Sequence, residues 1–213
     1  MNPQAYADRA YALSKSNFST ESKKMLIIGN SFARDFYNAL DESGSTKGYE
    51  VVYLYDYFSD KTLSRKLVKD ANVVIYVSSS GMANRTPALD DLKRSAFEVK
   101  NELDLYSNGN YYFVGTKNFG YNNNFIRWVD WGDSLDYMVD INKSNIIAND
   151  FESKVFGDKY IDVLSLFRVG DKVRMFTDEH RFISFDTDHI TKYGAQYLGE
   201  KLVSATRIKN LLL

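Results

Sequence analysis

The sequence contains no cysteine, which excludes disulfide bonds, thiolate nucleophiles and cysteine-ligated metal sites. It also lacks long apolar runs. No stretch approaches the roughly 20 residues that cross a bilayer, and the N-terminus lacks the apolar core of a signal peptide. Neither sign of charge is in excess, because 27 basic side chains accompany 28 acidic ones. These absences argue against nucleic acid as a partner and against direct insertion into a membrane.

The residues that are present suit one medium-sized domain. The 213 residues show no internal duplication, and a hydrophobic share of 44% is sufficient for a core. Residues 1–22 are polar and rich in serine, and we interpret them as a lead-in segment with a short helix near Tyr6 to Leu13. Residues 23–213 are predicted to form the domain itself.

Five short apolar runs predict strands that are buried on both faces: 25–28, 51–55, 73–77, 111–114 and 160–164. Between them, apolar residues recur at helical spacing, as Phe32, Phe36 and Leu40 do. Strands that alternate with helices imply a parallel sheet covered on both sides. The prediction is an α/β fold, a three-layer α/β/α sandwich with a flavodoxin-like five-stranded parallel sheet. In this architecture, ligands bind beyond the carboxyl ends of the strands.

The first predicted strand ends at Gly29-Asn30-Ser31, and a helix is expected to start near Phe32. A serine at such a tight turn exposes its hydroxyl above the sheet, and its backbone N–H lies at the positive end of the helix dipole. An acyl-transfer nucleophile needs an accessible hydroxyl and a donor for the developing oxyanion. Serine is also a common helix N-cap, so the turn alone leaves both roles of Ser31 open.

His189 precedes an amphipathic stretch near the C-terminus and follows Asp186 by three residues. This spacing can place both side chains in one loop, where the carboxylate receives the Nδ1 proton and leaves Nε2 to accept a proton from a hydroxyl. The other histidine, His180, lies in the charged stretch 177–181, which is typical of a solvated turn. A purely structural pairing of His189 with Asp186 or Asp188 is the alternative.

Together, these two ends of the sequence resemble blocks I and V of the SGNH (GDSL-like) hydrolases. Segments 26–36 and 186–195 are similar to the SGNH domains that follow membrane acyltransferase modules in bacterial polysaccharide O-acylation proteins. The resemblance implies an SGNH hydrolase fold and an esterase or O-acyltransferase activity on short acyl esters of carbohydrate, above all acetyl esters. It implies Ser31 as nucleophile, His189 as general base and Asp186 as the orienting carboxylate.

The oxyanion hole departs from the pattern of this family. The family's Gly-x-Asn-Asp signature after the third strand is absent, and the run Ser78 to Ser80 occupies its place. The loop after the fourth strand is rich in glycine and asparagine. The glycine, asparagine and serine residues of both loops are also typical of ordinary turns. The candidate oxyanion donors all lie at strand exits: Ser31, Gly81, Asn84 and Asn118, with a hydroxyl of the 78–80 run as a further option.

Two further features accompany these motifs. Arg34 and Asp35 follow Ser31 on its predicted helix, and we expect them to make structural or cleft-edge polar contacts. Trp128 and Trp131 have the character of a sugar platform, but anchoring a loop to the core is the favoured interpretation. No metal or cofactor is expected, because the two histidines are separated and no nucleotide-binding glycine pattern occurs.

The expected partner is an acylated carbohydrate or a small ester. The chain is expected to be soluble, cytoplasmic if it is complete and extracytoplasmic if it is part of, or paired with, a membrane acyltransferase. Two other functions are considered. A catalytically degenerate SGNH-fold domain that binds carbohydrate or acts as a scaffold would explain the altered oxyanion pattern. A flavodoxin-like nucleotide or signalling module is supported by architecture alone.

Overall fold

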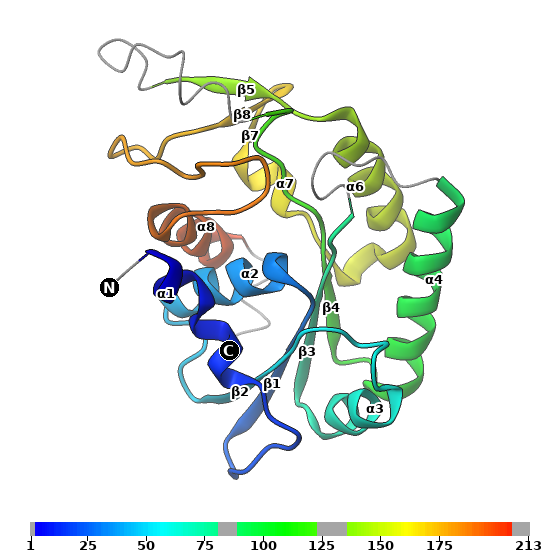
Figure 1. Ribbon diagram of the computed structural model, residues 1–213. Coiled ribbons are helices and arrows are strands. Elements are labelled where there is room, and N and C mark those ends of the chain that lie inside the picture. Colours follow the sequence, from blue (N-terminus) through cyan, green and yellow to red (C-terminus); the bar gives the residue numbers. More distant parts are fainter. Residues whose placement is uncertain (1–2, 81–88, 123–135, 206–213) are drawn as a thin grey trace.

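A computed structural model of the chain describes residues 3–80, 89–122 and 136–205 (Figure 1). Five parallel strands form the central sheet in the spatial order β2-β1-β3-β4-β6. This order is the flavodoxin-like one, so the predicted parallel sheet is confirmed. The strands are β1 (Lys23–Ile28), β2 (Tyr49–Leu54), β3 (Val73–Val77), β4 (Tyr111–Val114) and β6 (Tyr160–Ile161).

Helices cover both faces of this sheet and complete the predicted three-layer sandwich (Figure 1). One face carries α2 (Ser31–Glu42), α7 (Val163–Phe167) and α8 (Lys192–Ser204). The other face carries α3 (Lys61–Asp70), α4 (Leu89–Tyr106) and α6 (Lys143–Phe156), and the 3₁₀ turn η3 (Gly157–Lys159) follows α6.

Side chains of β1 alternate between the two cores. Met25 and Ile27 pack under α2 and α8, whereas Leu26 and Ile28 pack under α3 and α4. Successive strand residues point to opposite faces, and both faces are covered here. For this reason the strand is a continuous apolar run rather than an alternating one.

The N-terminal segment packs on the same face as α2. Its two short helices are α1 (Pro3–Ala7) and the 3₁₀ helix η1 (Asp8–Leu13), and both contact α2. The side chains of Tyr6 and Ala10 are buried in the core on this face. Residues 3–13 therefore form part of the packed unit around the nearby helices.

Two parts of the fold differ from the prediction. The run 160–164 forms a strand only at its start, because Asp162 caps α7: its carboxylate accepts a hydrogen bond from the N–H of Ser165 at 3.0 Å. A second, antiparallel sheet was not predicted. Its strands lie in the order β5-β8-β7 and are β5 (Met138–Asp140), β7 (Arg168–Val169) and β8 (Lys172–Arg174).

Candidate functional site

The turn between β1 and α2 is fixed by close backbone contacts. Gly29 has a φ of +136°, and a Cβ at this position would lie 2.8 Å from the carbonyl oxygen of Val77. Only glycine accepts both constraints without strain. The hydroxyl of Tyr53 donates to the carbonyl oxygens of Gly29 and Asn30, each at 2.6 Å. Sequence reasoning counted Tyr53 only as a strand residue, because nothing local marks its contact with the turn.

Asn30, not Ser31, caps helix α2. The Asn30 side-chain oxygen accepts a hydrogen bond from the N–H of Phe32 at 3.0 Å, and its carbonyl oxygen accepts from the N–H groups of Ala33 and Arg34. Ser31 is the first residue of the helix. Its hydroxyl is therefore not used as a cap, and among these bonds none occupies its backbone N–H.

Three side chains from the two ends of the chain form one hydrogen-bonded series. The Oγ of Ser31 lies 2.9 Å from Nε2 of His189, and Nδ1 of His189 lies 2.9 Å from Oδ2 of Asp186. The imidazole is thus held between a hydroxyl and a carboxylate. A ring in this position can receive the hydroxyl proton at Nε2 while the carboxylate accepts the N–H at Nδ1.

The loop that carries His189 is ordered by Asp186. Oδ1 of Asp186 accepts hydrogen bonds from the backbone N–H groups of Asp188 and His189, at 2.7 and 2.6 Å. Burial alone would raise the pKa of Asp186, but the hydrogen bonds from the His189 ring and from these two N–H groups lower it to about 2. Asp186 is therefore an ionised acceptor at neutral pH.

The four predicted oxyanion donors differ in where they lie and in whether their polar groups are already engaged. Gly81 and Asn84 lie outside the described residues. Asn118 is fully buried and is engaged in its own loop: its amide donates to the carbonyl oxygen of Gly120 at 3.1 Å, and its side-chain oxygen accepts from the N–H groups of Gly120 and Asn142. These bonds favour the structural role for Asn118. The Ser31 backbone N–H is at the helix N-terminus, as the sequence indicated.

The hydroxyls of two serines after β3 form hydrogen bonds with a buried glutamate, and not with Ser31 or His189. Ser78 and Ser80 each donate through Oγ to Oε1 of Glu152 at 2.7 Å. The other oxygen of Glu152, Oε2, is buried and has no hydrogen-bond partner among the described residues. Burial raises the pKa of Glu152 from 4.5 to about 7, although the two hydroxyls oppose this shift. Sequence reasoning missed Glu152, which lies in the middle of α6.

Replacing Glu152 with glutamine should make the free energy of unfolding less sensitive to pH. Because the folded-state pKa of about 7 lies above the ordinary value of 4.5, the stabilising effect of protonated Glu152 is complete below pH 4.5 and is lost as pH rises through 7. The shift corresponds to roughly 3 kcal/mol, at about 1.4 kcal/mol per pKa unit. Urea unfolding from acid to neutral pH should therefore show Glu152→Gln gaining stability relative to the native chain.

The size of this gain with pH is the diagnostic quantity, because a buried glutamine amide adds a cost that does not depend on pH. Glu200→Gln, at an exposed position of α8, is the matched control and should show no such gain. A constant difference in unfolding free energy between Glu152→Gln and the native chain over this range would contradict the raised pKa.

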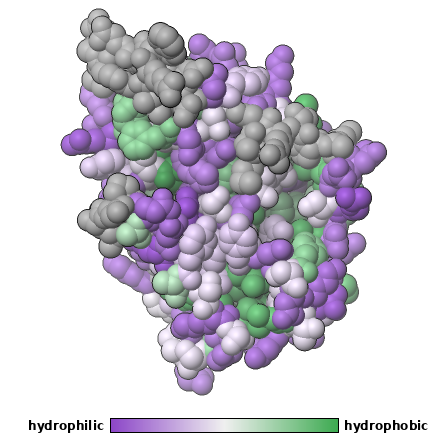
Figure 2. Space-filling view, in the orientation of Figure 1, coloured by the Kyte–Doolittle hydropathy of each residue, from purple (hydrophilic) through white to green (hydrophobic). Residues whose placement is uncertain are grey.

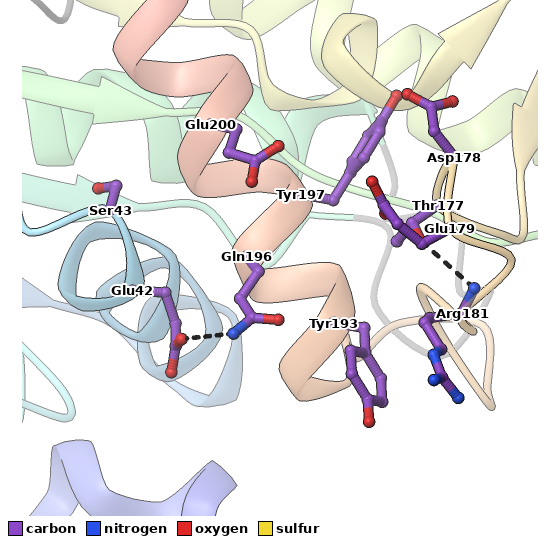
Figure 3. A pocket seen from close by; sticks show the side chains of 10 residues that line it. All are labelled: Glu42, Ser43, Thr177, Asp178, Glu179, Arg181, Tyr193, Gln196, Tyr197 and Glu200. Atoms are coloured by element: carbon purple, nitrogen blue, oxygen red, sulfur yellow. Dashed lines mark hydrogen bonds between the residues drawn. The ribbon is translucent and has the colours of Figure 1, made fainter.

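A cavity of about 540 Å³ lies elsewhere on the molecule (Figure 3). It is bordered by the C-terminal end of α2, by α8 and by the loop 177–181, and Tyr193, Gln196 and Glu200 line it from α8. None of the three hydrogen-bonded residues Ser31, Asp186 and His189 lines this cavity. The face of the molecule that Figure 2 shows is mainly hydrophilic, with separate hydrophobic patches.

Metal binding, membrane spanning and the two tryptophans are the remaining points raised by the sequence. No group of three or more His, Asp or Glu side chains in the described ranges is placed to hold a metal ion. Among the helices that the structure describes, none is long and apolar enough to cross a membrane. Trp128 and Trp131, considered above as a sugar platform or loop anchor, lie outside the described residues.

Comparison with known proteins agrees with this architecture. No protein-family model and no curated protein matches the sequence. The periplasmic domain of a lipopolysaccharide acetyltransferase from Salmonella ser. Paratyphi A is similar in structure, with a TM-score of 0.66 and 17% identity over 92% of this chain and 87% of that one. A GDSL-like lipase from Bacteroides thetaiotaomicron has a TM-score of 0.51 and 11% identity, covering 98% of each chain.

These similarities first define a class, the α/β/α proteins that include acyltransferase and lipase domains. More particularly, the fold is SGNH hydrolase-like, which agrees with the resemblance seen at the two ends of the sequence. At these identities the comparisons show the fold alone. The function has to be argued from the side chains of the site.

Proposed function

We propose that this chain is a serine-dependent acyl-transfer enzyme, an esterase or O-acyltransferase. The observation that carries the proposal is the continuous hydrogen-bonded series from Asp186 through His189 to Ser31, with 2.9 Å at both contacts of the imidazole. This arrangement has the geometry that activates a hydroxyl as a nucleophile. The SGNH hydrolase-like fold supports the same reaction class, because its solved examples include an acetyltransferase domain and a lipase.

The reaction proceeds in two acyl transfers. Oγ of Ser31 attacks the carbonyl carbon of an ester while Nε2 of His189 takes the hydroxyl proton, and the protonated ring is stabilised by Asp186. His189 then returns the proton to the departing alcohol, which leaves an acyl-enzyme on Ser31. In the second transfer, His189 removes a proton from water or from an acceptor hydroxyl. Attack on the acyl carbon releases the acid or the new ester, and Ser31 recovers its proton.

The N-terminus of α2 supplies charge stabilisation for this reaction. Asn30 occupies the N–H of Phe32, and its carbonyl oxygen receives the two N–H groups that follow. The backbone N–H of Ser31 then serves as the first-turn donor for the oxyanion, in the positive field of the helix end. One such donor contributes about 10²–10³-fold in rate. We place Ser31 in both roles, as nucleophile and as oxyanion donor.

The proposed substrate is a short acyl ester of carbohydrate, with acetyl as the acyl group. Support comes from the sequence similarity of segments 26–36 and 186–195 to domains of polysaccharide O-acylation proteins. It also comes from the fold similarity to the lipopolysaccharide acetyltransferase domain. Hydrolase and transferase share every step up to the acyl-enzyme, and they differ only in whether water or a sugar hydroxyl accepts the acyl group.

Active-site labelling tests the proposal. The purified chain should hydrolyse p-nitrophenyl acetate and react with a fluorophosphonate probe, and peptide mapping should place the label on Ser31. Ser31→Ala should lose both activities. Ser165→Ala, at an exposed position of α7, is the matched control and should keep both. A native chain that is neither labelled nor active would contradict the proposal and favour a non-catalytic carbohydrate-binding or scaffold domain.

A further inference from the structure

A buried group of charges surrounds Asp35, which lies on the helix of Ser31. Asp35 is 1% exposed and Lys117, from the loop after β4, is 4% exposed. Nζ of Lys117 lies 3.1 Å from Oδ2 of Asp35, and NH2 of Arg34 lies 3.2 Å from Oδ1. Sequence reasoning expected structural or cleft-edge contacts for Arg34 and Asp35, and the structure places both side chains in the interior.

The same carboxylate contacts the loop of the base. Oδ2 of Asp35 accepts a hydrogen bond from the backbone N–H of Ile190 at 3.0 Å. Ile190 directly follows His189, and Asp35 lies one helical turn after Ser31. One side chain therefore joins the segment that carries the hydroxyl to the segment that carries the imidazole.

Lys117 makes a further contact, through Phe32, with the ring of His189. Its Nζ lies 3.4 Å from the centre of the Phe32 ring, and the Phe32 ring stands edge-on to the His189 ring with 6.3 Å between centroids. Burial lowers the pKa of Lys117, and the neighbouring Asp35 opposes that shift. Lys117 also lines a small cavity together with apolar residues such as Val77, Val114 and Leu198.

Stability alone gives little reason for such an ion pair. Desolvation of two buried charges offsets most of their attraction, and apolar residues of similar volume are often as stable. An apolar side chain at position 35, however, could not accept the hydrogen bond from Ile190. A hydrophobic residue therefore cannot replace the Asp35 oxygen that accepts the hydrogen bond from the His189 loop.

We propose that Asp35 is a positioning residue, which holds the loop of His189 against the helix of Ser31 through its acceptor oxygen. Lys117 holds that oxygen in place. The inference rests on the proposed function for its effect on turnover. The hydrogen bond between Asp35 and Ile190, here called the tether, can be measured without any activity. Removal of the acceptor should displace His189 from Ser31, and a displacement of about 1 Å costs on the order of 10²-fold in rate.

Two double variants separate the acceptor from the charge. Asp35→Asn with Lys117→Met, the amide variant, removes both charges and keeps an oxygen that can accept from Ile190. Asp35→Ala with Lys117→Met, the truncated variant, removes the same charges and also the acceptor. In both, Arg34 retains its contact with Asp8 at 3.0 Å. The comparison therefore changes one functional group, the side-chain amide at position 35, on an otherwise identical background.

The kinetic readout is kcat against KM for p-nitrophenyl acetate. We expect the amide variant to keep kcat near that of the native chain. We expect the truncated variant to lose about 10–10²-fold in kcat with KM little changed. Glu102→Gln is the matched control, because Glu102 is a buried carboxylate on the opposite face, paired with Arg65 at 2.7 Å, and should leave kcat unaltered.

Hydrogen exchange at the Ile190 amide is the second readout. Exchange should be slow in the native chain and in the amide variant, and at least about tenfold faster in the truncated variant. Equal kcat in the two double variants, equal exchange, or unfolding of the truncated variant alone would each overturn the inference. A native chain without Ser31-dependent activity would instead count against the proposed function, and the exchange result would still decide the tether.

Discussion

Replacing His189 with asparagine should reduce kcat for ester hydrolysis by about 10⁶-fold, the loss seen when the base of a hydrogen-bonded triad is removed. The reason is geometric as well as chemical. The Oγ of Ser31 has its proton acceptor at 2.9 Å in the native chain, and an asparagine amide has no basic nitrogen to take that proton. The Ser31 hydroxyl would remain protonated and weakly nucleophilic. Initial rates with p-nitrophenyl acetate, corrected for spontaneous hydrolysis, measure the loss.

His180→Asn is the matched control, since the sequence has only two histidines. His180 has a φ of +58° in the loop between Phe176 and Phe182, and asparagine tolerates this left-handed conformation. The control should therefore fold and hydrolyse the ester as the native chain does. Equal losses in the two variants would mean that neither histidine acts as the base. Retained activity in His189→Asn would reject the proposed mechanism directly.

The main sheet and the triad motifs are predictable because both depend on local patterns. A parallel strand covered on both faces has to be apolar throughout, as residues 73–77 are, and Asp186 and His189 lie within one short loop. The role of Ser31 stayed ambiguous because serine and asparagine are both good N-caps. The assignment of the cap to Asn30 depends on the helix starting one residue earlier than expected, which no composition signal reveals.

Contacts between distant segments are the part that the sequence does not reveal. Strands β5 and β8 pair Met138 with Arg174, and segments of three residues carry no pattern that selects this register. The contacts of Asp35 with Lys117 and Ile190 have no local signature either. Ile190 fits the apolar stripe of the last helix, yet it precedes α8 and its N–H is satisfied by Asp35. Satisfying a buried backbone group is a tertiary requirement.

Replacing Asp186 with asparagine should reduce kcat by about 10⁴-fold while leaving the loop in place. Oδ1 of Asp186 accepts the N–H groups of Asp188 and His189, and the amide oxygen of asparagine can do the same. The amide nitrogen then faces Nδ1 of His189 and donates to it. The imidazole must carry its proton on Nε2, where it can no longer accept the proton of Ser31. The loss therefore comes from the wrong tautomer rather than from a disordered loop.

The pH dependence separates this mechanism from a general loss of structure. Hydrogen bonds keep the pKa of Asp186 at about 2 against the effect of burial, so its carboxylate is ionised across the usual assay range. The deficit of Asp186→Asn should accordingly be present at every pH from about 5 to about 9, in a chain that still folds but is less stable at neutral pH, because the lowered pKa of Asp186 means that its charge stabilises the folded state. Asp188→Asn changes the neighbouring carboxylate of the same loop and should retain activity within about tenfold, because the carboxylate that contacts Nδ1 of the ring is that of Asp186. A larger loss in Asp188→Asn than in Asp186→Asn would assign the orienting role to the other carboxylate.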